Sequence, residues 1–111
     1  MNTAIDTAAA LKRVDGDMEF LRELFGIFVE ELPGLLVSIR HALRDQDPQA
    51  LALAAHTIKG AAASIEATAV TEAAKQLELM GRTGDLQGSD AVLIALDVAV
   101  ERFKDAVGSI A

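Results

Sequence analysis

Residues 55–65 read Ala-His-Thr-Ile-Lys-Gly-Ala-Ala-Ala-Ser-Ile, a run with the apolar spacing of an α-helix. At about 100° per residue, one stripe of this helix collects only apolar side chains, namely Leu51, Ala54, Ala55, Ile58, Ala61, Ala62 and Ile65. The opposite side collects Ala52, His56, Lys59, Gly60 and Ala63. We therefore expect His56 to face solvent, with Lys59 and Gly60 beside it at the spacing of surface neighbours.

The segments before this run also predict helices. A first helix is expected from Thr3 to Val14, ending near the turn-forming pair Asp15-Gly16. A second begins near Asp17, which can cap it, and carries apolar residues at helical spacing as far as Leu43. Because this spacing continues across Pro33-Gly34, we expect one long helix with a kink.

The remaining boundaries are marked by capping residues and glycines. Asp47 followed by Pro48 is typical of a helix start, so this pair opens the helix that carries His56, which should stop around Ile65 or Glu66. The next helix should begin near Thr68 and end at Gly81, and Ser89 with Asp90 should open the last one after a polar connection.

These segments predict an all-α fold, an antiparallel four-helix bundle with an additional short N-terminal helix over one end. The 111 residues suit a single domain spanning 1–111, and a hydrophobic content of 51% is enough for one core. Aromatic residues make up only 4% of the chain, and no strand-like alternation persists.

Charge and composition disfavour several classes of partner. The net charge of −7 would repel nucleic acid and an anionic membrane surface. The sequence has no apolar run long enough to span a membrane, and its N-terminus lacks the form of a signal peptide. It also contains no cysteine. We expect a cytoplasmic monomer that needs no cofactor.

The surroundings of His56 suit a phosphoryl group carried on a ring nitrogen. Histidine has an ordinary pKa of about 6.5, so much of it is a neutral nucleophile at cellular pH. A lysine one turn away can offset the charge of a phosphoryl group and donate a hydrogen bond to it. Gly60 leaves room for a partner protein to approach, although glycine costs a helix about 1 kcal/mol relative to alanine.

Residues 55–82 resemble the histidine-containing phosphotransfer (HPt) domains of multistep two-component relays. The resemblance rests on Ala55, His56, Thr57, Lys59 and Gly60, then Leu77-Glu78 and Gly81-Arg82, with weaker agreement upstream at Phe28, Pro33, Leu36, Ile39 and Ala42-Leu43. Three positions depart from the family pattern: Ala61 replaces a frequent serine, Ser64 a frequent asparagine, and Glu66 a usual glycine.

The resemblance implies that His56 accepts a phosphoryl group from a receiver-domain aspartate and passes it to another receiver. Partners would be the receiver domains of response regulators and hybrid histidine kinases. Lys59 and Gly60 would support the phosphoryl group, and Glu78 could accept a hydrogen bond from the imidazole. The other candidates for orienting or docking are Ala52, Ala63, Ser64 and Arg82.

The sequence lacks the residues that a metal site or a nucleotide-dependent enzyme would need. A di-iron bundle needs Glu-x-x-His pairs, but Ser38 precedes His41 and Leu53 precedes His56 at that spacing. Two histidines without cysteine do not make a zinc site, so we expect no metal. The chain has no nucleotide-binding motif, so we expect a phosphocarrier and not an enzyme. His41 lacks the Lys and Gly neighbours of His56, and we interpret it as solvated.

Two alternatives remain open. One is the phosphoacceptor domain of a chemotaxis-type histidine kinase, which would be charged by an ATP-dependent kinase domain. The other is an adaptor bundle that binds its partners without being phosphorylated.

Overall fold

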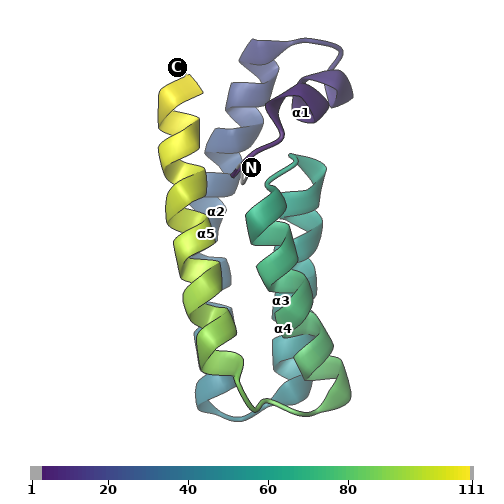
Figure 1. The fold of residues 1–111 in the computed structure, drawn as a ribbon, viewed down its shortest axis with the longest axis vertical. Coiled ribbons are helices and arrows are strands. Elements are labelled where there is room, and N and C mark those ends of the chain that lie inside the picture. The colour runs from purple at the N-terminus through teal and green to yellow at the C-terminus, as the bar shows by residue number, and fades with distance from the viewer. Residues whose placement is uncertain (1–3, 111) are drawn as a thin grey trace.

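The computed structural model describes residues 4–110, which form five α-helices and no strand (Figure 1). The helices are α1 (Thr7–Arg13), α2 (Met18–Arg44), α3 (Pro48–Ser64), α4 (Thr68–Thr83) and α5 (Ser89–Ile110). Helices α2 to α5 run antiparallel to their neighbours along the long axis, and α1 lies at the end where α2 begins (Figure 1). The predicted fold class is confirmed.

Helix α2 is continuous through Pro33, as the apolar spacing predicts. The Asp17 carboxylate caps its first turn by accepting a hydrogen bond from the backbone N–H of Phe20 at 3.0 Å. Proline has no N–H to donate within the helix, and Pro33 lies on the exposed side of α2. The buried face of α2 continues on both sides of this residue, through Leu32 and Ile39.

The bundle core is a single cluster of buried apolar side chains, mostly aliphatic, that includes one group of aromatic rings. The Phe103 ring of α5 meets the rings of Phe25 and Phe28 of α2 edge to face, with centroids 5.8 and 5.3 Å apart. On α3, Leu51, Ala55, Ile58 and Ala62 are buried, as their shared stripe predicts. Burial of this stripe fixes the rotation of α3 and turns His56 outward.

Two helix boundaries differ from the predicted ones. Helix α1 begins at Thr7 and is capped by Asp6, whose carboxylate accepts from the N–H of Ala9, whereas Thr3 lies outside the described residues. Helix α4 does not end at Gly81 but continues to Thr83, and Gly84 closes it in the left-handed conformation with φ 80°. Gly81 lies inside the helix for a packing reason described below.

The turn after α3 takes its shape at Glu66, where the family usually has glycine. Glu66 adopts φ 58°, a left-handed conformation that is unfavourable for most residues with a Cβ. Its carboxylate pairs with Arg13 at 2.6 Å, and its carbonyl accepts from the N–H of Asp6 at 3.0 Å. The turn therefore also joins the N-terminal segment to the end of the bundle.

Candidate functional site

His56 lies midway along α3 and points toward α4. Its side chain is 59% exposed, and its Nδ1 atom lies 3.0 Å from Oε2 of Glu78, whose side chain is only 5% exposed. The buried carboxylate thus holds one edge of the imidazole, and the Nε2 edge is turned away from this contact. The predicted exposure of His56 is confirmed.

Glu78 is the centre of a charged cluster between α3 and α4. Its Oε1 atom contacts Nζ of Lys59 at 2.6 Å. Its Oε2 atom accepts from the Arg82 guanidinium, with Nη2 at 2.6 Å and Nε at 3.0 Å. Sequence spacing indicated that Lys59 and His56 are neighbours, but it did not show that the ammonium is already engaged by a buried carboxylate.

These contacts fix the ionisation of Glu78. Hydrogen bonds from Lys59, then from Arg82 and more weakly from His56, together outweigh the opposing effect of burial and lower the pKa of Glu78 from 4.5 to about 2. At neutral pH the carboxylate is ionised and can only accept hydrogen bonds. The Nδ1 atom of His56 must therefore carry the proton, which leaves the lone pair of the neutral ring on Nε2.

Gly81 lets α3 and α4 approach closely near this cluster. A Cβ atom on Gly81 would lie 2.6 Å from the backbone N of Ala52 and 2.6 Å from the backbone O of Pro48, so no larger residue fits without a shift. Gly81 is three residues after Glu78, and Ala52 is four residues before His56. The close contact therefore sets the separation of the two helices one turn from the His56–Glu78 hydrogen bond.

Gly60 has a different environment from Gly81. A Cβ atom on Gly60 would meet nothing within 4 Å, and the residue is exposed one turn after His56. Its lack of a side chain is not required by packing. It leaves open the surface beside the imidazole.

The other predicted site residues lie at various distances from the cluster. Arg82 belongs to it, and Ala52 is half-buried beneath Gly81. Ala63 and Ser64 are about two turns further along α3, and the Ser64 hydroxyl donates to the carbonyl of Ala61 at 2.7 Å. Their part in docking stays a prediction.

Sequence reasoning missed three exposed residues near His56. Leu53 is three residues before His56 on α3, and this large apolar side chain is exposed. On α4, the exposed residues Lys75 and Leu79 line a small pocket together with Lys59, Glu78 and Arg82. Leucine at a solvent-facing helical position is the signal that could have pointed to Leu53 and Leu79.

His41 is exposed on α2, as predicted. It lines an open groove between α2 and α3 that also includes Leu53 and Thr57. Within residues 4–110 it has no carboxylate partner of the kind that Glu78 provides for His56. The two histidines of the chain therefore differ in whether a buried group orients the ring.

Residues 4–110 contain neither a metal-binding group of side chains nor a membrane-spanning helix. No group of three or more His, Asp or Glu side chains there could hold a metal ion. Of the five helices, none combines the length and the apolar character needed to cross a bilayer.

A helical bundle that exposes one oriented imidazole next to two cations is suited to carrying a phosphoryl group on the ring. The sequence profile of the Hpt domain family matches residues 23–106, and the chain belongs to this family. It is thus a histidine phosphotransfer intermediate of two-component phosphorelays. Members of the Hpt family interact with receiver domains.

A solved structure supports the same fold. The chain is similar to histidine-containing phosphotransfer protein B (HptB) from Pseudomonas aeruginosa PAO1, with a TM-score of 0.88 and 23% sequence identity; the match covers 98% of this chain and 95% of that chain. No curated protein matches the chain by sequence.

Proposed function

We propose that Nε2 of His56 is the phosphoacceptor, and that it takes the phosphoryl group from the aspartyl phosphate of one receiver domain and passes it to the aspartate of another. The observation that carries this proposal is the contact between Nδ1 of His56 and the ionised Glu78 carboxylate. It holds the ring with its protonated edge toward the protein and its nucleophilic edge outward.

The transfer step is a displacement at phosphorus. The Nε2 lone pair attacks the phosphorus atom, the bond from phosphorus to the aspartate oxygen breaks, and the aspartate leaves as a carboxylate. The ring becomes positively charged as the N–P bond forms, and the Glu78 carboxylate, which accepts from Nδ1–H, stabilises this charge. The reverse sequence delivers the phosphoryl group to the next receiver.

Lys59 and Arg82 would supply the positive charge that stabilises the phosphoryl group on His56. Both contact Glu78, so the cluster of Glu78, Lys59 and Arg82 carries one net positive charge before transfer. A phosphoryl group on Nε2 adds about two negative charges next to it. We expect at least one of the two cations to shift from Glu78 toward the phosphoryl oxygens.

The rest of the catalytic apparatus would come from the partner. Phosphoryl transfer depends on positioning and on cations at the phosphorus, and we assign the metal-bearing acidic pocket to the receiver. We propose that this chain has no kinase activity of its own and that residues 1–111 act as one domain. We further propose that it is a cytoplasmic monomer that binds neither nucleic acid nor membrane, in keeping with its net charge of −7.

The docking surface is proposed to centre on Gly60, with the exposed Leu53 and Leu79 supplying apolar contacts. A Gly60→Gln variant should lose transfer from a charged receiver and keep transfer from phosphoramidate, a donor too small to need docking. Equal losses with both donors would assign Gly60 to the local geometry of the imidazole.

A comparison of two macromolecular donors separates the relay from the chemotaxis-type alternative. The chain is mixed either with a phosphorylated receiver or with an ATP-charged kinase domain, and the phosphate bound to the chain is counted. Rapid labelling by the receiver alone supports the relay. Labelling by the kinase domain alone supports the alternative, and intact signalling by a His56→Gln variant would support the adaptor.

A further inference from the structure

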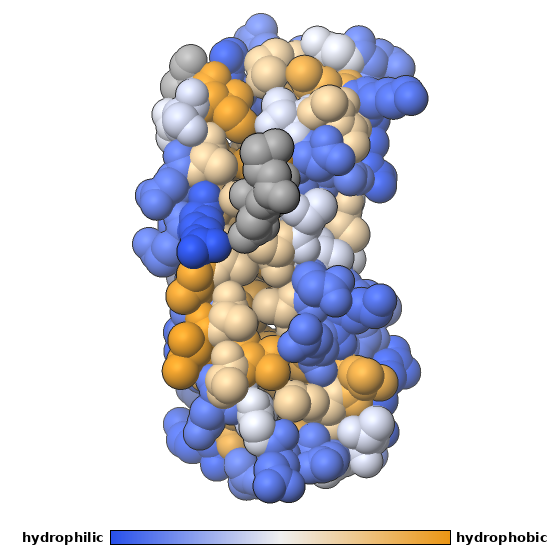
Figure 2. All heavy atoms as spheres, viewed as in Figure 1, coloured by the Kyte–Doolittle hydropathy of each residue, from blue (hydrophilic) through white to orange (hydrophobic). Residues whose placement is uncertain are grey.

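A second surface with unusual composition lies on the opposite side of α4 from Glu78. The groove between α4 and α5 has a floor of alanines, with Ala69 and Ala73 from α4 and Ala95 and Ala99 from α5. Figure 2 looks onto the side where these two helices are in front, and it shows pale orange and orange atoms gathered along them. Because alanine side chains are short, they leave a hollow between the helices that larger residues would fill.

Exposed branched side chains extend the apolar surface of this groove. Val98 lines the groove and is partly exposed, and Ile94, one turn earlier on the same side of α5, is also exposed. Together with the alanine floor, these two side chains give this side of α4 and α5 an apolar surface, a feature of interaction sites. We refer to Ala69, Ala73, Ala95, Val98 and Ala99 as the α4–α5 groove.

The walls of the α4–α5 groove carry one charge of each sign. Glu72 stands on the α4 side and Arg102 on the α5 side, and both side chains are exposed. Neither forms an ion pair within residues 4–110, so both are available to a partner. The groove therefore offers an acceptor on one wall and a donor on the other.

We propose that the α4–α5 groove binds an amphipathic helix of a partner protein, with a basic residue against Glu72 and an acidic residue against Arg102. A helix with an apolar stripe fits a groove between two helices, because its larger side chains can fill the space above the alanine floor. A second copy of this chain fits less well, because each copy carries a net charge of −7.

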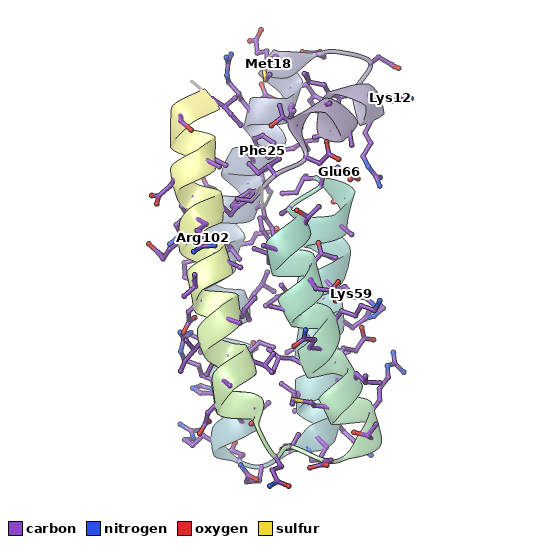
Figure 3. All side chains as sticks on the ribbon, in the orientation of Figure 1. Lys12, Met18, Phe25, Lys59, Glu66 and Arg102 are labelled. Atoms are coloured by element: carbon purple, nitrogen blue, oxygen red, sulfur yellow. The ribbon has the colours of Figure 1, made fainter. Side chains whose placement is uncertain are left out.

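Binding at this groove leaves the His56 site free. Gln76 lines the groove, and Glu78, two residues later, points about 200° away around α4. Figure 3 shows the same separation, with Arg102 on α5 and Lys59 at the far side of the α3–α4 pair. Binding at this groove is a property separate from phosphotransfer and does not require it. A helix held in this groove would tether its protein beside His56 and raise its local concentration.

A synthetic helical peptide with a leucine stripe, flanked by one row of lysines and one row of glutamates, is the probe. Its addition to the isotopically labelled chain should give saturable NMR shifts at the methyl groups of Ala69, Ala73, Ala95 and Ala99, and none at the His56 ring. A control peptide with glutamine in place of every charged residue should bind more weakly.

Two exposed valines give a matched pair of variants. Val98 is 45% exposed in the groove, whereas Val37 is 49% exposed on α2, outside the residues that line the groove. Val98→Glu should weaken peptide binding by about tenfold or more, because it places a charge on the apolar strip. Val37→Glu adds the same charge and should change binding less than about twofold.

Several results would overturn the proposal. These are an absence of saturable shifts, shifts that map away from the groove, equal effects of the two valine variants, or equal binding of the two peptides. Groove shifts that appear on concentrating the free chain, together with a doubled mass in sedimentation, would assign the groove to a second copy.

Discussion

Nδ1 of His56 on α3 lies 3.0 Å from Oε2 of the buried Glu78 on α4. The two residues are 22 positions apart in the chain, so their contact depends on the packing of two helices and not on local spacing. Close approach at Gly81 holds these helices together one turn away. The reactivity proposed for the imidazole therefore depends on the packing of the bundle beneath it.

Replacing Glu78 with glutamine should slow phosphotransfer by about 10- to 100-fold, because a charge-assisted hydrogen bond is worth about 1.5–3 kcal/mol. The neutral amide can donate as well as accept, so it no longer forces the proton onto Nδ1. Nitrogen chemical shifts of the His56 ring measure this directly. A variant with parent-like transfer and an unchanged proton position would remove the positioning role of Glu78.

Acid titration of stability provides a second readout on Glu78. Its pKa is lowered in the folded chain, from 4.5 to about 2, so the stabilising effect of its ionised form is complete above about pH 4.5 and is lost as the pH falls toward 2. The free energy of unfolding of the parent should therefore fall more steeply over this range than that of the Glu78→Gln variant. Parallel curves for the two proteins would contradict the assigned pKa.

Lys59→Ala should slow transfer, because the ammonium compensates charge that exists only when the phosphoryl group is present. The solvent-side position of Lys59 alone predicts a stability loss below about 1 kcal/mol. Its 2.6 Å contact with the buried Glu78 raises the expected loss to about 1–3 kcal/mol.

Lys75→Ala is the control for this variant, since Lys75 lines the same small pocket but has no carboxylate partner within the described residues. It should change stability by less than about 0.5 kcal/mol. Urea unfolding and the transfer rate are measured on both variants. Equal effects of the two substitutions would make Lys59 an ordinary surface lysine.

The two glycines near the site should respond to alanine in opposite directions. Gly60→Ala should raise the free energy of unfolding by up to about 1 kcal/mol, because alanine is the better helix former and its Cβ meets no atom within 4 Å. Gly81→Ala should lower it by about 1–3 kcal/mol, because its Cβ would overlap the α3 backbone. The Gly81→Ala substitution should also slow phosphotransfer, because it moves His56 away from Glu78. Equal shifts in denaturation midpoint would contradict this account of their packing.

Local patterns in the sequence predict most of the fold. Capping at Asp17 and Asp47 and the apolar spacing of α2 and α3 are properties of neighbouring residues, so they can be read without a structure. The end of α4 could not be read in this way. Gly81 has the residue type of a helix terminator, but it serves the close approach of α3, which is a contact between residues distant in the chain.

The candidate site also combines features set by neighbouring residues with contacts between residues distant in the chain. The exposure of His56 and its proximity to Lys59 and Gly60 follow from helical spacing. The family resemblance pointed to Glu78, but the sharing of its carboxylate by His56, Lys59 and Arg82 depends on the distance between two helices. The spacing of four residues predicts that Arg82 lies near Glu78 on the surface of α4. Which side of α4 faces α3 can be seen only in the packed structure.

The most direct test of the account is the position of the phosphoryl group after the chain is mixed with a phosphorylated receiver domain. Acid-labile, alkali-stable phosphate is counted on the parent, on His56→Gln and on His41→Gln, and phosphorus–nitrogen couplings identify the bonded ring nitrogen. We expect phosphate on Nε2 of His56, none on His56→Gln, and a parent-like rate for His41→Gln. Labelling of His56→Gln at a rate near that of the parent, or phosphate on Nδ1, would contradict it.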